Sequence, residues 1–190
     1  MEKIKVLTDE VASQIAAGEV IERPGSVVKE LVENAIDAGA SKITVRISEA
    51  GKKLIEVADN GRGISFEELE LAVARHATSK LQKATDLFKI QTLGFRGEAL
   101  ASLASVSHFS LISKQMEVEL GGKIENSAGK AFQVSYSGGP DGTSVIVRNL
   151  FFNVPARLKF LKSDITEKQK ISSLITKFAL KLMRNGLLRQ

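Results

Sequence analysis

The chain has 190 residues, of which 43% are hydrophobic and 26% charged, as expected for one globular domain. No apolar run is long enough to cross a bilayer, and the N-terminus lacks the apolar stretch of a secretory signal, which predicts a soluble intracellular protein. The absence of cysteine excludes disulfides and thiolate zinc sites, so any metal is expected to be a hard, oxygen-ligated ion.

The net charge of +5 is distributed unevenly along the chain. Residues 151–190 hold nine Lys and Arg against two Asp and Glu, whereas residues 1–150 are slightly acidic. Such a basic end predicts either contact with nucleic acid phosphates or a solvated helix face. Charge alone does not separate these two interpretations.

Two helices are predicted first, a short one over residues 9–22 and a stronger one that follows Pro24-Gly25-Ser26 and ends at Gly39. The second helix is amphipathic, because its apolar residues share one face at 100° per residue. Its opposite face carries a polar stripe of Glu30, Glu33, Asn34 and Asp37.

A hairpin is predicted next, with strands over residues 43–47 and 54–58 and a glycine-rich bend that begins at Asp59. Ser65 and Glu68 have the spacing of a capping box and open a helix through about Arg75. The segment 76–92 is polar and broken, with one short apolar helix near Leu87. A glycine-rich loop over residues 94–97 then leads into a helix over 98–106.

The rest of the chain predicts a group of strands and then two helices. Alternating polar and apolar residues indicate antiparallel strands over residues 108–114, 117–124, 130–136 and 143–150. A short helix runs from Pro155 to Leu161, and Asp164 with Glu167 caps a last helix that ends at Asn185-Gly186. Helices followed by a meander of strands predict an α+β sandwich.

No segment matches a P-loop, so a nucleotide site in this chain requires other features. The carboxylate of Asp59 at a strand end can accept a hydrogen bond from an amino group, and the glycines after it let the backbone approach a flat ring. The loop over residues 94–97 offers backbone N–H groups at the start of a helix, where phosphates bind. Taken singly, these features and the polar stripe are also compatible with ordinary solvent-exposed structure.

The order of these features resembles that of the GHKL ATPases, and six strings in particular resemble the MutL-type DNA mismatch-repair branch. The resemblance runs from about residue 4 to 163. The strings are Ala16-Ala17-Gly18-Glu19-Val20-Ile21, Glu30-Leu31-Val32-Glu33-Asn34 through Asp37-Ala38-Gly39-Ala40, Asp59-Asn60-Gly61-Arg62-Gly63-Ile64, Arg75-His76-Ala77-Thr78-Ser79-Lys80, Gly94-Phe95-Arg96-Gly97-Glu98-Ala99-Leu100, and Asn153-Val154-Pro155-Ala156-Arg157.

The resemblance implies a two-layer GHKL (Bergerat) fold, in which helices cover one face of a mixed, mostly antiparallel sheet. It implies an ATP-binding domain over residues 1–163, followed over 164–190 by a C-terminal helix that starts, or links to, a second domain. ATP and Mg²⁺ are the implied cofactors. By the same resemblance, Glu30 is the general base for the attacking water and Asn34 holds Mg²⁺.

For the nucleotide itself, the resemblance implies that Asp59 recognises the adenine amino group and that Gly63 lies close to the base. Thr78 and Thr143 complete the hydrogen bonds of the adenine, partly through water. The loop of Gly94, Phe95, Arg96 and Gly97 is the hinge of the ATP lid, and the backbone amides of its last three residues contact the phosphates.

The implied function is Mg²⁺-dependent ATP hydrolysis that orders a lid and switches dimerisation during mismatch repair. The alternative is a nucleotide-gated dimerising scaffold without efficient hydrolysis, because in the family a lysine of the second domain reaches the γ-phosphate and no motif here replaces it. The implied partners are a second copy of this chain or a related chain, a mismatch-recognition protein, and DNA phosphates, which are bound weakly. No membrane contact is implied. The basic stripe for DNA consists of Lys170, Lys177, Lys181 and Arg184.

Overall fold

The computed structural model describes residues 20–74, 98–127 and 130–184, together with the single residues 6, 8, 15, 17, 18 and 77. Five of the predicted site residues lie outside this part of the chain: Thr78, Gly94, Phe95, Arg96 and Gly97. Most of the predicted helix over 9–22 and nearly all of the segment 76–92 also lie outside it.

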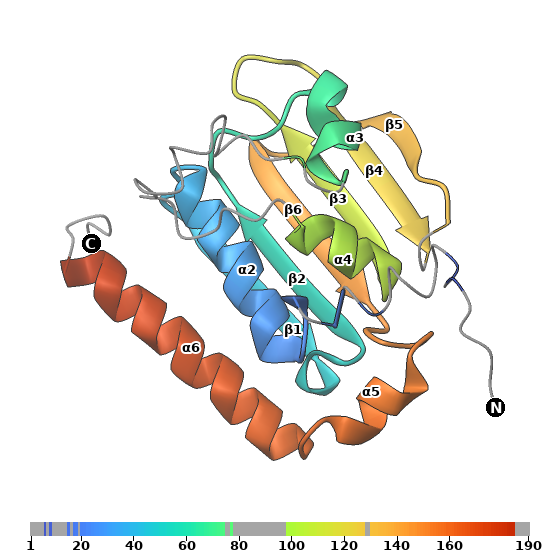
Figure 1. Ribbon diagram of the computed structural model, residues 1–190. Coiled ribbons are helices and arrows are strands. Elements are labelled where there is room, and N and C mark those ends of the chain that lie inside the picture. The colour runs from blue at the N-terminus through green and yellow to red at the C-terminus, as the bar shows by residue number, and fades with distance from the viewer. Residues whose placement is uncertain are drawn as a thin grey trace, which may run out of the picture.

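Six strands form one sheet in the order β1-β2-β6-β3-β4-β5, and every pairing among them is antiparallel (Figure 1). The predicted α+β sandwich is confirmed. The last strand in sequence, β6, lies between β2 and β3 and joins the N-terminal hairpin to the meander β3-β4-β5. The strands are β1 (Ile43–Ser48), β2 (Leu54–Asp59), β3 (His108–Lys114), β4 (Gly121–Ser127), β5 (Gln133–Ser137) and β6 (Gly142–Arg148).

Three helices, α2, α3 and α4, lie on one face of the sheet, and α6 runs beside α2 (Figure 1). The core fills the space between the layers, with Val28, Val57 and Leu111 almost completely buried. Their burial follows from the apolar face of α2 and from the alternation within β2 and β3. The helices and helical turns are α2 (Pro24–Asp37), η1 (Glu49–Gly51), η2 (Phe66–Glu68), α3 (Leu69–Ala72), α4 (Ala99–Ser105), α5 (Pro155–Phe160) and α6 (Asp164–Arg184).

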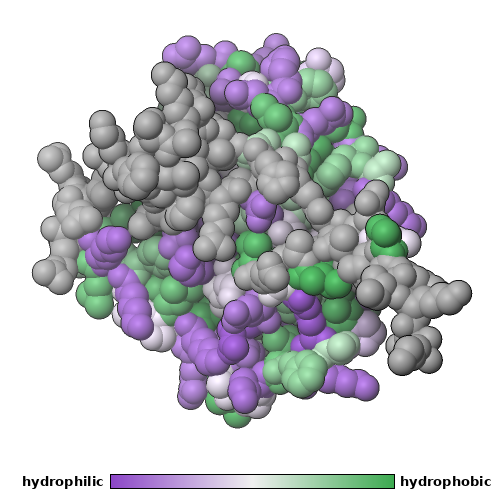
Figure 2. All heavy atoms as spheres, viewed as in Figure 1, coloured by the Kyte–Doolittle hydropathy of each residue, from purple (hydrophilic) through white to green (hydrophobic). Residues whose placement is uncertain are grey.

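The first half of α6 is fixed to the domain by both apolar and charged side chains. Ile171 is 2% exposed, and the buried carboxylate of Glu167 lies 3.7 Å from the Arg23 guanidinium, just before α2. Lys52, which follows η1, forms an ion pair of 2.8 Å with Asp164. Figure 2 shows hydrophilic side chains interspersed with hydrophobic ones along the outer edge that α6 forms. None of the described helices is both long and apolar enough to cross a membrane.

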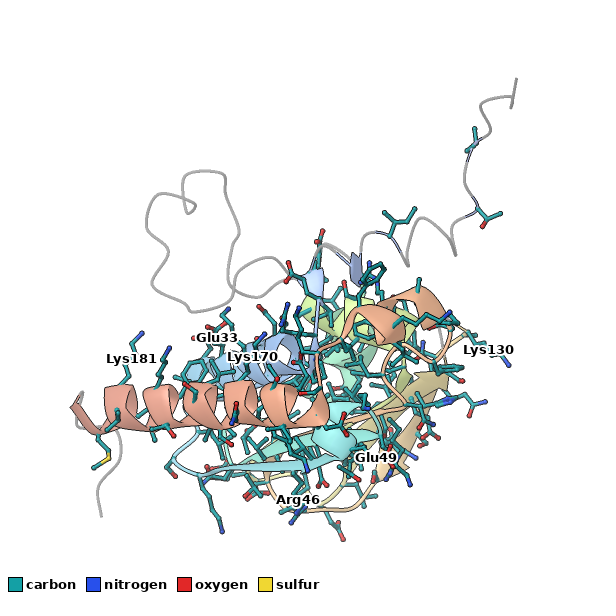
Figure 3. All side chains as sticks on the ribbon, turned by 90° about the horizontal axis from the view of Figure 1, so that it is seen from below. Glu33, Arg46, Glu49, Lys130, Lys170 and Lys181 are labelled. Carbon is teal, nitrogen blue, oxygen red and sulfur yellow. The ribbon has the colours of Figure 1, made fainter. Side chains whose placement is uncertain are left out.

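The two faces of the sheet differ in what covers them. In Figure 3, Glu33 lies on the side of the helical layer, whereas Arg46 of β1 lies on the opposite side. Arg46 forms an ion pair of 2.7 Å with Glu56 of the neighbouring strand. Within the described part of the chain, no helix lies over this second face, which accounts for its polar side chains.

The strand predicted over residues 117–124 is displaced in the structure, where β4 runs from Gly121 to Ser127. Val118 and Leu120 continue the alternation but lie in an exposed connection, in which Glu117 has a positive φ of 73°. Gly122 lies in this strand, at a position where a Cβ would collide with Leu69 of α3. The prediction followed the alternation and missed the close packing that requires glycine.

Two helices begin differently from the predictions. The continuous helix expected from Ser65 is a 3-10 turn, η2, followed by the four-residue α3, and the Ser65 hydroxyl donates to the Glu68 carboxylate at 3.0 Å instead of capping the backbone. At α6 the cap is Ser163, whose Oγ accepts the N–H of Thr166 at 3.3 Å. Asp164 is already the first helical residue and was wrongly predicted as the cap.

Candidate functional site

Asp59 ends β2 at the edge of the helical layer, paired across the sheet with Thr143 of β6. Its Oδ1 accepts the backbone N–H of Gly61 at 2.8 Å. Burial raises the pKa of Asp59 above its ordinary value, whereas hydrogen bonds from the backbone N–H groups of Gly61 and Thr143 act to lower it. Because an ionised carboxylate has about four acceptor positions, Asp59 can accept a further donor from outside the protein.

The glycines near Asp59 are required by close approaches between backbone segments. Gly63 has a φ of +71°, and a Cβ there would collide with the carbonyl group of Lys114. Gly142 has a φ of +106°, and its Cβ would collide with the carbonyl oxygen of Asp59 itself. Both positions therefore exclude side chains, for conformational and steric reasons. The predicted proximity of Gly63 to a base stays a prediction.

The bend after β2 is also bonded to the end of α2 and to the residues after it. The side-chain oxygen of Asn60 accepts the N–H groups of Ser41 at 3.0 Å and of Lys42 at 2.8 Å. The N–H of Arg62 donates to the carbonyl of Ala38, just beyond α2, at 3.0 Å. These bonds fix the position of Asp59 relative to the helix that carries Glu30 and Asn34.

Ser113 of β3 is a site residue that the sequence interpretation missed. It is 1% exposed and lies in register with Thr143, so Asp59, Thr143 and Ser113 form a row across β2, β6 and β3. Its Oγ accepts the N–H of Ile64 at 2.8 Å, donates to the carbonyl of Gly142 at 3.0 Å and lies 2.9 Å from Thr143 Oγ1. The available signal was a serine at the core-facing position of an otherwise apolar alternation.

The polar stripe of α2 is organised by Lys29, which the sequence interpretation did not consider. Its Nζ lies 2.9 Å from Glu33 and 3.4 Å from Glu30. Glu33 is nearly buried, whereas the Glu30 side chain is 26% exposed. Although burial of the ammonium acts to lower it, the pKa of Lys29 is raised above its ordinary value by Glu33 and Glu30. Glu30 and Asn34, both half-buried, remain the stripe's candidates for ligand contact.

The sequence strings over residues 16–21 and 153–157 lie in contact through Arg157. The Arg157 guanidinium donates to the carbonyl of Ile21 at 3.1 Å and lies 5.7 Å from the centre of the Phe151 ring. A Cβ on Gly18 would overlap the guanidinium. The Arg157 guanidinium thus occupies the space that a side chain at position 18 would need. Through this contact and the bond to Ile21, α5 holds the segment before α2.

The family follows from the comparison with known proteins. Residues 22–127 match the family model described as histidine kinase-, DNA gyrase B-, and HSP90-like ATPase. The chain belongs to this ATPase family. The predicted resemblance to the N-terminal ATPase domain of MutL-type proteins is confirmed at the level of sequence and fold by the relatives that follow.

The chain is 53% identical to the DNA mismatch repair protein MutL of Acidobacterium capsulatum over 95% of its own length, and 52% identical to that of Koribacter versatilis. It spans only 27% and 28% of the length of these two relatives. Among solved structures, the Aquifex aeolicus MutL ATPase domain complexed with ADP is 42% identical, with a TM-score of 0.66. That match covers 86% of this chain and 57% of the Aquifex chain.

Proposed function

We propose that this chain binds ATP with Mg²⁺ and hydrolyses it, as the ATPase domain of a MutL-type mismatch-repair protein. The observation that carries the proposal is Asp59, a half-buried carboxylate that two backbone N–H groups hold at a strand end beside Thr143. The ADP complex of the related Aquifex domain supports a nucleotide as the ligand. Because the chain is a small part of its relatives, their repair activity is part of the proposal.

In this proposal the adenine amino group donates to Asp59, and Thr143 takes part in the same hydrogen-bond network, partly through water. The backbone at Gly63, whose Cβ position is filled by the Lys114 carbonyl group, lies close to the base in this proposal. Thr78 completes the contacts of the base. The lid hinge of Gly94, Phe95, Arg96 and Gly97 supplies backbone amides to the phosphates, as helix N-termini do elsewhere.

The residues of α2 fit a magnesium ion that is shared with the nucleotide. Asn34 offers an amide oxygen, a hard donor, one helical turn beyond Glu30. The described residues contain no cluster of three or more Asp, Glu, His or Cys side chains that could bind a metal ion. Mg²⁺ commonly takes one or two protein ligands and completes its shell with phosphates and water. When bound, it neutralises phosphate charge.

Glu30 is the proposed general base. Its side chain is partly exposed and held near Lys29, whereas its neighbour Glu33 is buried in an ion pair and is a structural residue in this proposal. A carboxylate that orients the attacking water and accepts its proton is the main contribution that a protein makes to this chemistry besides charge stabilisation.

ATP binding then orders the lid and lets two chains associate, and hydrolysis releases them. A mismatch-recognition protein and DNA phosphates complete the proposed partners. Lys170 and Lys181 project from the same side of α6 in Figure 3, and Lys177 is also exposed. The Arg184 side chain lies outside the described residues. We also propose that α6 continues toward a second domain, with the boundary of the ATP-binding domain near residue 163.

The test is titration calorimetry with Mg-ATP and Mg-GTP, together with a turnover assay. We expect binding of Mg-ATP in preference to Mg-GTP, and slow hydrolysis that Glu30→Ala reduces by about 10²- to 10⁴-fold with little change in affinity. Binding without any turnover favours the alternative, a nucleotide-gated scaffold. Failure to bind Mg-ATP, or equal affinity for both nucleotides, would refute the proposal.

A further inference from the structure

Asp59, Thr143 and Ser113 lie side by side on three neighbouring strands, with Thr143 in the centre. Asp59 and Thr143 are half-buried and can be reached by a ligand, whereas Ser113 is 1% exposed and cannot. Ser113 can therefore influence a ligand only through the groups that it holds. Those groups are the bend after Gly63, through the N–H of Ile64, and the first two residues of β6.

A count of hydrogens defines the direction of each bond at Ser113. A serine hydroxyl has one hydrogen and two lone pairs. One lone pair accepts the N–H of Ile64 at 2.8 Å, and the hydrogen is donated to the carbonyl of Gly142 at 3.0 Å. The contact of 2.9 Å with Thr143 Oγ1 must then use the second lone pair, so Thr143 donates its hydroxyl hydrogen to Ser113.

The bond to Ser113 limits how the Thr143 hydroxyl can contact a ligand. With its only hydrogen directed at Ser113, the Thr143 hydroxyl can act only as an acceptor toward a ligand group, or a bridging water, that contacts it directly, and the inference concerns the direct contact. The neighbouring carboxylate of Asp59 is also an acceptor when ionised. The row thus presents two acceptors, which match a ligand amino group and oppose a ligand carbonyl oxygen. Adenine carries an amino group at C6, whereas guanine and hypoxanthine carry a carbonyl oxygen there.

We infer that Ser113 is a specificity-determining positioning residue, which holds the Thr143 hydroxyl as an acceptor and so makes the site discriminate against 6-oxopurine nucleotides. This inference rests on the proposed adenine site. In Ser113→Ala the Thr143 hydroxyl is free to rotate and can donate to a 6-oxo group. Discrimination then falls, although Asp59 is unchanged.

The experiment is calorimetric titration of Mg-ATP, Mg-GTP and Mg-ITP against the whole chain and its variants. Inosine triphosphate is included because it has the 6-oxo group of guanine without the 2-amino group. For Ser113→Ala we expect the ratios of ATP to GTP affinity and of ATP to ITP affinity each to fall by about three- to tenfold, the equivalent of one hydrogen bond. The matched control is Ser110→Ala, on the same strand, because the Ser110 Oγ is buried and has no hydrogen-bond partner. Its ratios should not change.

A purely structural role for Ser113 predicts a different result, because a distorted site weakens all three nucleotides by the same factor. Unchanged ratios in Ser113→Ala would therefore overturn the inference, even if every affinity falls. If Ser113→Ala does not fold, Thr143→Val removes the same acceptor, and the same loss of ratio is expected; its absence overturns the inference equally. Failure of the proposed function is visible separately, as absent ATP binding or absent discrimination in the unmodified chain.

Discussion

The two ends of the candidate site are constructed in different ways. At the end that contains Asp59, three strands, two positive-φ glycines and the buried Ser113 hold the polar groups through backbone hydrogen bonds. On α2, Glu30 and Glu33 both form ion pairs with Lys29, and within the described residues neither carboxylate has another ion-pair partner. The Lys29 side chain is 47% exposed.

The difference indicates that the Asp59 end, the proposed base-binding end, is preformed, whereas the α2 end, the proposed phosphate-binding end, can adjust when charge arrives. Backbone hydrogen bonds between packed strands change little without unfolding, while a half-exposed lysine can exchange partners at small cost. Such a division suits a ligand whose base identifies it and whose phosphates change during the reaction.

Gly142→Ala should damage the preformed end most severely. Its φ of +106° is unfavourable for alanine, and the new Cβ would collide with the backbone of Asp59, so we expect the free energy of unfolding to fall by about 3 kcal/mol or more. Gly39→Ala is the control, because its φ is also positive, at +77°, but its Cβ meets no atom; a cost of about 1 kcal/mol is expected. Urea unfolding of both variants measures the difference, and equal losses contradict the steric argument.

Asp59→Asn should weaken Mg-ATP binding by about 1–3 kcal/mol, the cost of mismatching a buried polar partner. The asparagine can still accept the N–H of Gly61, so the bend should persist. Calorimetry compares this variant with Asp164→Asn, an exposed aspartate at the start of α6 whose ion-pair partner is Lys52. If Asp59→Asn and Asp164→Asn bind ATP equally well, Asp59 does not recognise the base.

Lys29→Met should lower the free energy of unfolding by about 1 kcal/mol, because it leaves the buried Glu33 carboxylate without its partner, although exposure of the lysine limits the loss. Adding Glu33→Gln should restore most of this stability. Lys53→Met removes an exposed partner of Glu49 and should change stability by less than about 0.5 kcal/mol. Denaturant unfolding measures all three, and a double variant no more stable than Lys29→Met argues against the ion pair as the cause.

The pH dependence of stability should reveal the cost of burying the ionised Asp59 carboxylate. Because its pKa is raised in the folded chain, the folded state binds the proton more tightly than the unfolded state. The stabilisation from protonated Asp59 is complete below about pH 3.8, its ordinary pKa, and is lost as the pH rises through the folded-state pKa. Asp59→Asn should therefore gain stability relative to the unmodified chain from pH 4 toward neutrality. A gain that shrinks with rising pH would show that the sign is wrong.

Much of the scaffold of the site could be predicted from local patterns. The periodicity of α2 placed Glu30 and Asn34 on one polar stripe, and the alternation in β2 placed Asp59 at a strand end. The displaced β4 shows where such reasoning fails, since the apolar alternation over 117–120 occurs in an exposed connection. Alternation reports which residues could share a face, but packing against α3 decided which residues did.

The helix of the polar stripe and the hairpin that ends at Asp59 could be predicted from sequence, because each depends on short-range spacing within one or two elements. The family resemblance could be recognised as well, because it depends on short strings and on their order along the chain. Three other features became visible in the folded chain alone: β6 lies in the middle of the sheet, Glu33 is nearly buried beside Lys29, and Ser113 holds both Ile64 and Thr143. The physical reason is distance along the chain: Ser113 lies 49 residues from Ile64 and 30 from Thr143, and no local periodicity encodes a partner that far away.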